Sequence, residues 1–203
     1  ILTTPEQYAK AAEQALADGY DAIKVDVNEI DLEGRAKKRN LYGCFARRDL
    51  LVGYERLKAI REAVGDKIDI IVEAHALTDT TSAIEFGNMI EEFRIAAYEE
   101  PVMALNPGQL KQVKDGINIP IAAGERVYTR WGFRPCQIHV CGGPIMTAAA
   151  LQLECAIPNF AIHELHRYAL LEGNRVTCKY DYLPVNGKYQ IPDLPGIGQE
   201  LTD

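Results

Sequence analysis

Ile68-Asp69-Ile70-Ile71-Val72-Glu73 is a short apolar run that ends in a carboxylate. Two runs of the same kind follow it, Ile95-Ala96-Ala97-Tyr98-Glu99 and Ile119-Pro120-Ile121-Ala122-Ala123-Gly124-Glu125. Each step from one terminal glutamate to the next is 26 residues long, and a helical sequence lies between the runs. Strand, loop, helix and loop therefore repeat as one unit. Successive units of this kind predict a parallel sheet with helices outside it.

Three more apolar runs, at residues 22–27, 137–141 and 160–165, bring the predicted strands to six. Helices are expected to begin after Thr4, before Tyr54, at Thr78-Asp79, at Asn106 and at Pro144. The alternation predicts an α/β fold of the TIM-type (β/α)8 barrel class over residues 1–170, followed by an irregular extension over residues 171–203. A complete barrel takes about 250 residues. Because this chain has 203 residues, we expect the barrel to be incomplete.

The junction between the fourth and fifth predicted strands is too short for this pattern. Residues 126–136 separate Glu125 from Gln137, and they have no apolar stripe of a helix. A parallel crossover needs a dozen or more residues, usually with a helix. Either the parallel pattern breaks here or residues are missing near Pro135 and Cys136, and we favour missing residues.

The composition excludes several classes of protein. The chain has 22 Lys and Arg against 29 Asp and Glu, a formal charge of −7, and no basic stripe, which argues against nucleic-acid binding. No apolar run approaches the roughly 20 residues of a membrane-spanning helix. Five cysteines without paired metal-type spacing fit a reducing cytoplasm. We expect a cytoplasmic homo-oligomer that acts on a small molecule.

Glu73, Glu99 and Glu125 are the candidate metal ligands. The carboxyl ends of parallel strands meet on one face of a barrel, where such folds place their active sites. Three carboxylates supply hard oxygen donors, which suit Mg²⁺, and their mutual repulsion is relieved by a cation. Any one of them taken alone could equally be a solvated strand end; the equal spacing of all three is the signal.

Two histidines and a lysine–aspartate pair lie near the same predicted face. His75 follows Glu73 by two residues, and His139 lies near the top of a later strand. A histidine can exchange a proton near neutral pH, although each could also be a hydrogen-bonded structural residue. Lys24 and Asp26 alternate with Val25 and so share one face of their strand, either as a structural ion pair or as part of the site.

Two further features could contribute to binding. Glu164 ends the last predicted strand, where a protonated carboxyl could hydrogen-bond a substrate carboxylate. His163 and His166 flank it and are interpreted as ordinary packing residues. The polar, basic stretch at residues 28–49 is typical of a solvated surface, although it could also attract an acidic substrate.

These motifs resemble the enolase superfamily, in its mandelate racemase/muconate lactonizing branch, and within it the acid-sugar dehydratases of the galactonate dehydratase type. The resemblance runs from about Thr4 to the Pro-Gly-Ile-Gly tail. It rests on Lys24-Val25-Asp26, Val72-Glu73-Ala74-His75, Tyr98-Glu99-Glu100-Pro101, Ala122-Ala123-Gly124-Glu125-Arg126 and Ile138-His139, in this order.

The resemblance implies a barrel with a separate N-terminal α+β cap domain, and we expect that domain and the first barrel strand to lie outside these 203 residues. It implies Mg²⁺ held by Glu73, Glu99 and Glu125, with Glu73 where the family commonly has Asp. His139 would remove the α-proton of the substrate, and His75 would assist departure of the β-hydroxyl. The implied substrate contacts are Glu164, Lys24, Asp26 and Arg126.

Two departures from the family pattern bear on the reaction. The racemases carry Lys-x-Lys where this chain has Lys24 and Asp26, so a lysine base is not available from the second position. The aspartate that pairs with the seventh-strand histidine is not found, and it would fall at the short junction. We therefore expect a Mg²⁺-dependent sugar-acid dehydratase. A sugar-acid epimerase, racemase or cycloisomerase and a non-catalytic sugar-acid-binding homologue remain the alternatives.

Overall fold

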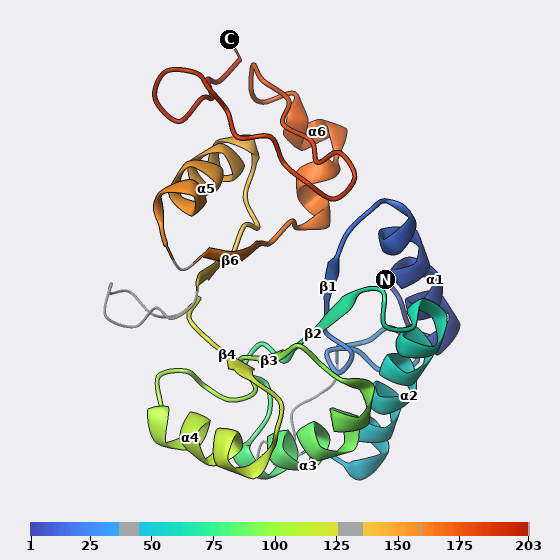
Figure 1. Ribbon diagram of the computed structural model, residues 1–203. Helices are drawn as coiled ribbons and strands as arrows, with labels where there is room; N and C mark the ends of the chain where they lie inside the picture. The colour runs from blue at the N-terminus through green and yellow to red at the C-terminus, as the bar shows by residue number, and fades with distance from the viewer. Residues whose placement is uncertain (37–44, 126–135, 159, 203) are drawn as a thin grey trace. The chain divides into compact units, whose positions relative to one another are not determined.

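The computed structural model describes residues 1–36, 45–125, 136–158 and 160–202 (Figure 1). The chain divides into two compact units, unit 1 over Ile1–Arg126 and unit 2 over Val127–Asp203. Pro135 and residues 37–44 of the basic stretch lie outside the described residues, as does Arg126. Each unit is considered by itself.

Unit 1 contains a four-stranded parallel sheet in the order β1-β2-β3-β4. Its strands are β1 (Ala22–Val25), β2 (Asp69–Glu73), β3 (Ala97–Glu99) and β4 (Ile121–Ala122). Each strand falls within a run that the sequence predicted, and each is followed by a helix before the next strand up to β4. The predicted α/β, parallel-strand organisation is therefore confirmed in this unit.

The helices of unit 1 are α1 (Pro5–Ala17), α2 (Arg47–Val64), α3 (Thr80–Ile90), the 3-10 turn η1 (Glu91–Phe93) and α4 (Pro107–Gly116). Helices α1, α3 and α4 begin where the capping residues predict, whereas α2 begins at Arg47, inside the stretch expected to be a loop, after Ala46, which makes no side-chain cap hydrogen bond. Thr4 and Gln7 form a capping box at α1, and Asp79 accepts hydrogen bonds from two backbone N–H groups at the start of α3. Thr78 does not share in that cap, because its hydroxyl donates to the carbonyl of Pro101 instead.

The two faces of the sheet carry different residues. Ile70, Val72 and Tyr98 belong to one hydrophobic core with α1 to α4, and the rings of Phe86 and Tyr98 meet edge to face at 6.2 Å. Side chains alternate between faces along a strand, so the residues between these point the other way. That opposite face ends in Glu73 and its neighbours, which places the charged groups away from the helices.

Arg56 fastens the loop after β1 to helix α2. Its guanidinium is fully buried and donates to the carbonyl oxygens of Thr3, Val27, Ile30 and Asp31, over 2.7 to 3.1 Å. Burial lowers the pKa of Arg56 from its ordinary value, because desolvation disfavours the charged form. The carbonyls compensate this cost, and Arg56 thereby connects the loop that follows Asp26 to α2.

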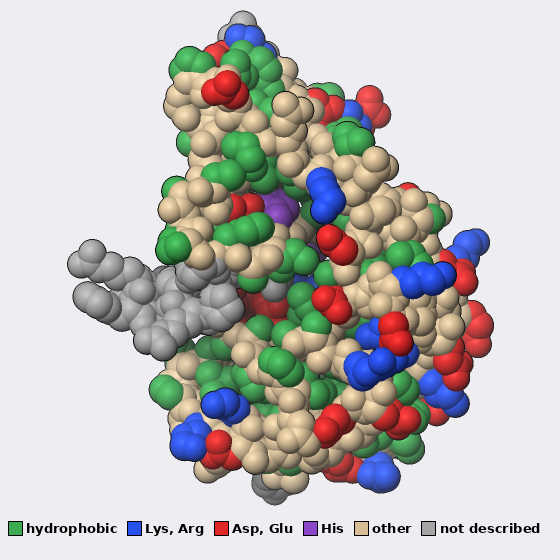
Figure 2. Space-filling view, viewed as in Figure 1, with side chains coloured by type: hydrophobic (Ala, Val, Ile, Leu, Met, Phe, Trp, Pro, Cys, Tyr) green, Lys and Arg blue, Asp and Glu red, His purple; other side chains and the backbone are tan. Residues whose placement is uncertain are grey.

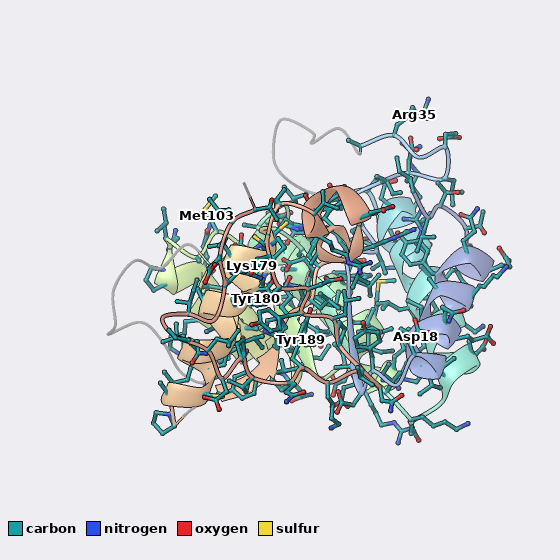
Figure 3. All side chains as sticks on the ribbon, turned by 90° about the horizontal axis from the view of Figure 1, so that it is seen from above. Asp18, Arg35, Met103, Lys179, Tyr180 and Tyr189 are labelled. Atoms are coloured by element: carbon teal, nitrogen blue, oxygen red, sulfur yellow. The ribbon has the colours of Figure 1, made fainter. Side chains whose placement is uncertain are left out.

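Unit 2 contains a pair of parallel strands, β5 (Cys136–Ile138) and β6 (Phe160–His163), joined by helix α5 (Pro144–Ala156). The remaining elements are two short turns of helix, η2 (Arg167–Leu170) and α6 (Glu172–Arg175). Beyond them the described residues up to 202 form no helix or strand, and α6 itself lies inside the predicted extension. Lys179, Tyr180 and Tyr189 lie along this segment (Figure 3).

The face drawn in Figure 2 has no continuous basic patch, and no described helix could span a membrane. On the face drawn in Figure 2, acidic and basic side chains are interspersed over unit 1, with no continuous basic patch among the coloured residues. Within the described ranges, no helix combines the length and the apolar character that crossing a bilayer requires.

Replacing Arg56 tests the anchor of the β1–α2 loop. Arg56→Met should lower the free energy of unfolding by about 3–5 kcal/mol, because buried carbonyls lose a charged donor. The matched control is Arg47→Met in the same helix, where an exposed arginine pairs with Glu85 at the surface and the loss should stay within about 0.5 kcal/mol. Urea denaturation measures both; equal losses in the two variants would contradict this role of Arg56.

Candidate active site

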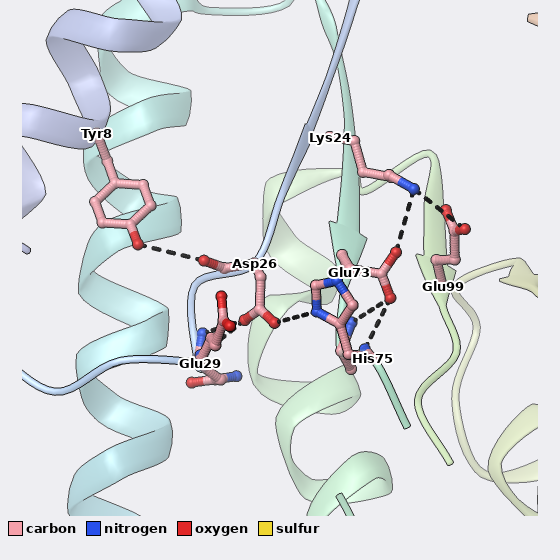
Figure 4. Close-up of polar contacts among 9 residues, drawn as sticks. Tyr8, Lys24, Asp26, Glu29, Glu73, His75 and Glu99 are labelled. Carbon is pink, nitrogen blue, oxygen red and sulfur yellow. Dashed lines mark hydrogen bonds and ion pairs between the residues drawn. The ribbon is translucent and has the colours of Figure 1, made fainter. Parts of the chain in front are cut away.

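The charged residues of unit 1 meet because the strand register aligns them. Val25 lies opposite Val72, and Glu73 lies opposite Glu99. Aligned residues of parallel strands point to the same face, so Glu73 and Glu99 stand side by side at the carboxyl edge of the sheet. Continuing the first register by one residue brings Asp26 next to Glu73 (Figure 4). The structure therefore brings together four of the predicted site residues, since Lys24 shares the face of Asp26.

Lys24 bridges the two glutamates. Its Nζ lies 3.2 Å from Oε2 of Glu73 and 3.2 Å from Oε1 of Glu99 (Figure 4). The side chains are 16%, 5% and 11% exposed respectively, so the three charges interact largely away from water. Two adjacent buried carboxylates repel each other, and the ammonium between them relieves that repulsion. Lys24 therefore forms ion pairs with two of the candidate metal ligands, and Asp26, its expected partner, pairs with His75.

Glu125 lies beyond the register that aligns the other two glutamates. Glu99 pairs with Ala122, so Glu125 comes three residues after the aligned position, in the turn that follows β4. Its side chain is exposed. In the ranges that the structure describes, no three His, Cys, Asp or Glu side chains converge into a metal-binding group. The equal 26-residue spacing thus corresponds to true alignment for Glu73 and Glu99 only.

The chemistry of this donor set nevertheless fits a hard divalent cation. Glu73 and Glu99 offer carboxylate oxygens at the sheet edge, and oxygen donors of this kind are those that Mg²⁺ prefers. Oε1 of Glu73 also accepts the backbone N–H groups of Ala74 and His75, at 3.0 and 2.8 Å, which fixes the orientation of the carboxylate. Glu73, Glu99 and Lys24 together carry two negative charges and one positive charge. The net negative charge of this group favours the binding of a cation.

His75 is held by Asp26. Its Nδ1 lies 2.8 Å from Oδ2 of Asp26, whose side chain is 8% exposed. The hydrogen bond to Asp26 raises the pKa of His75 to about 9, against the opposing effect of burial, and the charge of Glu73 adds to the rise. His75 is therefore protonated at neutral pH, and its ring can give up a proton rather than take one.

Unit 2 brings together two further predicted residues, His139 and Glu164. Ile138 pairs with His163, so the next residues, His139 and Glu164, also lie opposite each other. Nδ1 of His139 is 3.3 Å from Oε2 of Glu164, and the two side chains are 37% and 8% exposed. A carboxylate at this distance stabilises the imidazolium that forms when the histidine accepts a proton.

A second histidine–carboxylate pair in unit 2 was not predicted. Nδ1 of His163 lies 2.9 Å from both carboxylate oxygens of Glu154, a residue of α5, and the histidine ring meets Tyr189 edge to face at 4.8 Å. The pair is 10% and 4% exposed, so it packs α5 against β6. His163 is thus a packing residue, as the sequence analysis interpreted it, although it is adjacent to Glu164 in the sequence. Arg126, the remaining predicted contact, lies outside the described residues.

A protein-family model described as enolase C-terminal domain-like matches residues 7–136 and 134–203 of this chain. The match consists of two segments that meet at residues 134–136, which is where the sequence suggests that residues are missing. The boundary of the two segments coincides with the short junction between the fourth and fifth predicted strands.

Several relatives of this chain are named as sugar-acid dehydratases, and others are named as an epimerase and a cycloisomerase. D-xylonate dehydratase of Haloferax volcanii is 28% identical over 219 residues, covering 90% of this chain and 52% of that protein. Arabinonate dehydratase of Saccharolobus solfataricus is 31% identical over 226 residues, covering 93% and 61%. A crystal structure of an enolase-superfamily member from Salmonella Typhimurium matches with a TM-score of 0.94 at 55% identity, covering 100% of this chain and 61% of that one. The chain therefore spans a little over half the length of these proteins.

Removing the lysine tests the charge balance of the glutamate pair. Lys24→Met should lower the free energy of unfolding of metal-free protein by about 3–5 kcal/mol, because two buried carboxylates lose the cation between them. Lys58→Met is the control, since Lys58 is exposed and pairs with Glu62 at 4.0 Å; its loss should stay within about 0.5 kcal/mol. Chemical denaturation in the presence of a chelator measures both losses. An unchanged free energy of unfolding in Lys24→Met would contradict the claim that Lys24 relieves the repulsion between the two glutamates.

The Asp26–His75 pair predicts a pH dependence of stability. Folding raises the pKa of His75 from 6.5 to about 9, so its stabilisation is complete below about pH 6.5 and is lost as the pH rises through about 9. The stability deficit of His75→Gln relative to the parent protein should therefore be larger near pH 6 than near pH 10. Urea denaturation of metal-free protein at the two pH values measures it; a deficit that does not change with pH would contradict the pairing.

Proposed function

The chain belongs to the enolase C-terminal domain-like family, and from this premise we propose that it is the barrel portion of a Mg²⁺-dependent sugar-acid dehydratase. The membership agrees with the predicted resemblance and with the incomplete barrel-type α/β fold. The names of the D-xylonate and arabinonate dehydratases support a sugar acid as substrate. Glu73, Glu99 and Glu125 would hold the Mg²⁺, which when bound would polarise the substrate carboxylate and make its α-proton more acidic.

The observation that favours dehydration is the contact between Oδ2 of Asp26 and Nδ1 of His75, 2.8 Å apart. Elimination of a hydroxyl needs an acid, because hydroxide is a poor leaving group. The carboxylate of Asp26 raises the pKa of His75 to about 9, which keeps a proton ready on the ring at neutral pH. An epimerase or racemase has no leaving group to protonate. A site that holds an acid of this kind is therefore better suited to dehydration than to epimerisation or racemisation.

In the proposed reaction each histidine moves one proton. His139 takes the α-proton, and Glu164, 3.3 Å away, stabilises the imidazolium that results. The electron pair of the former C–H bond forms a carbon–carbon double bond as the β C–O bond breaks. His75 gives its proton to the departing hydroxyl, so water leaves. The enol that remains becomes a 2-keto-3-deoxy acid.

The other contacts in this proposal serve binding. Arg126 and Lys24 would attract the substrate carboxylate by their positive charge. Glu164 is assigned to His139 in place of the expected contact with that carboxylate, because an ionised carboxylate cannot donate a hydrogen bond to another. We also propose that the protein is a cytoplasmic homo-oligomer. The cytoplasmic part of this proposal is supported by Cys141, Cys155 and Cys178, which are free thiols, as a reducing compartment allows.

A screen of mono- and diacid sugars with Mg²⁺ tests the proposal. We expect at least one sugar acid to yield a 2-keto acid, detected with semicarbazide, and to exchange its α-proton in deuterated water. His139→Asn should abolish both signals, because it removes the base. His75→Asn should keep the exchange and slow product formation by about 10²–10⁴-fold, because it removes only the acid.

The other outcomes separate the alternatives. Exchange without any 2-keto acid in the parent protein would identify an isomerase, and metal-dependent binding with neither signal would identify a non-catalytic sugar-acid-binding protein. Full exchange in His139→Asn would show that another residue is the base.

A further inference from the structure

Asp26 is fixed rigidly at the end of β1. Its Oδ1 accepts the backbone N–H groups of Asn28 and Glu29, both at 2.8 Å, which forms a tight turn directly after the strand. The carbonyl of Asp26 also accepts a hydrogen bond from the hydroxyl of Tyr8 at 3.3 Å. With its side chain 8% exposed, the carboxylate has little freedom to reorient toward another molecule.

The second oxygen of Asp26 faces His75. Oδ2 lies 2.8 Å from Nδ1 of the imidazole (Figure 4). Because Nδ1 is engaged, Nε2 is the ring nitrogen through which His75 can transfer a proton to another molecule. The contact thus selects which end of the ring is available and fixes the plane of the ring.

The backbone of His75 needs this support. His75 and Ala76 have φ values of 49° and 55°, in the left-handed region that side chains with a Cβ rarely adopt. Oε1 of Glu73 holds the backbone by accepting the N–H of His75 at 2.8 Å, but no part of that contact reaches the ring. The side chain is 44% exposed, so packing alone does not restrict its rotamer. Glu73 therefore positions the backbone, and Asp26 positions the imidazole.

We propose that Asp26 is a positioning residue for the acid step, which holds His75 by Nδ1 and presents Nε2 to the departing hydroxyl. This inference rests on the proposed dehydratase function. It replaces the expectation that Asp26 contacts the substrate, because one carboxylate oxygen serves two backbone N–H groups and the other serves the histidine. It also gives a role to the aspartate that stands where the resemblance would place a second lysine.

The variant Asp26→Asn separates positioning from structural support. The amide oxygen can still accept the N–H groups of Asn28 and Glu29, so the turn is kept, but an NH₂ group now faces Nδ1 in place of a carboxylate oxygen. We expect formation of 2-keto acid to fall by about 10–100-fold, the usual cost of losing a residue that orients a catalytic group. Exchange of the α-proton in deuterated water should stay within about threefold of the parent value, because exchange depends on His139 and not on His75. KM should be unchanged.

The matched control is Asp31→Asn. Asp31 caps the next part of the same loop in the same way, accepting the N–H groups of Glu33 and Arg35 at 2.9 Å each. It pairs with Arg35, which points outward at the edge of the unit (Figure 3), whereas the carboxylate that contacts His75 is that of Asp26. Both rates should remain at the parent value in this control. If Asp26→Asn fails to fold, Asp26→Ser is the second variant, because a hydroxyl also caps a turn and is too short to reach the ring.

A spectroscopic measurement keeps the inference independent of the proposed function. In metal-free protein, the ¹⁵N NMR signal of His75 Nδ1 should be that of a protonated nitrogen in the parent and in Asp31→Asn, and it should change in Asp26→Asn. An unchanged signal in Asp26→Asn would overturn the positioning role whether or not a substrate is found.

The kinetic outcomes are equally decisive. Parallel loss of exchange and elimination in Asp26→Asn, or a raised KM with unchanged kcat, would overturn positioning in favour of general support or of substrate binding. If the parent protein neither exchanges nor eliminates with any sugar acid, the proposed function fails, and the NMR result alone decides whether Asp26 controls His75.

Discussion

The burial of two carboxylates side by side, Glu73 and Glu99, governs the arrangement of unit 1. Neighbouring parallel strands align them, and like charges held this close need a cation. Lys24 supplies one from the adjacent strand, at 3.2 Å from each. The other oxygen of Glu73 ties down the backbone that leads to His75. One carboxylate therefore links the charge balance of the sheet edge with the presentation of a histidine.

Most of the fold of unit 1 could be predicted because its signals are local. Alternation of faces, helix caps and terminal glutamates are all visible within a few residues, and the strands and helices appear where those signals place them. The equal spacing of the glutamates was a weaker guide than it appeared. Spacing counts residues along the chain, whereas alignment depends on strand register, which places Ala122 and not Glu125 opposite Glu99.

The contacts that assign roles to residues could not be predicted, because they join segments far apart in the sequence. Asp26 and His75 are 49 positions apart, and no local pattern indicates that one holds the other. Glu154 lies on a helix whose apolar sequence gives no hint that its carboxylate turns inward to His163. By contrast, His139 and Glu164 were both recognisable as strand-end residues, and the β5–β6 register explains why they meet. The sequence thus identified the chemical groups, and the register determines their partners.

The central claim is that Glu73 and Glu99 form a binding site for a divalent cation. Isothermal titration calorimetry of metal-free protein with Mg²⁺ tests it most directly, with Glu73→Gln and Glu99→Gln as variants that keep shape and lose charge. Glu33→Gln, on the exposed loop after β1, is the matched control. We predict that the parent and the control bind Mg²⁺ and that both site variants lose this binding. Absence of Mg²⁺ binding by the parent protein, or equal affinity in the site variants, would contradict the account.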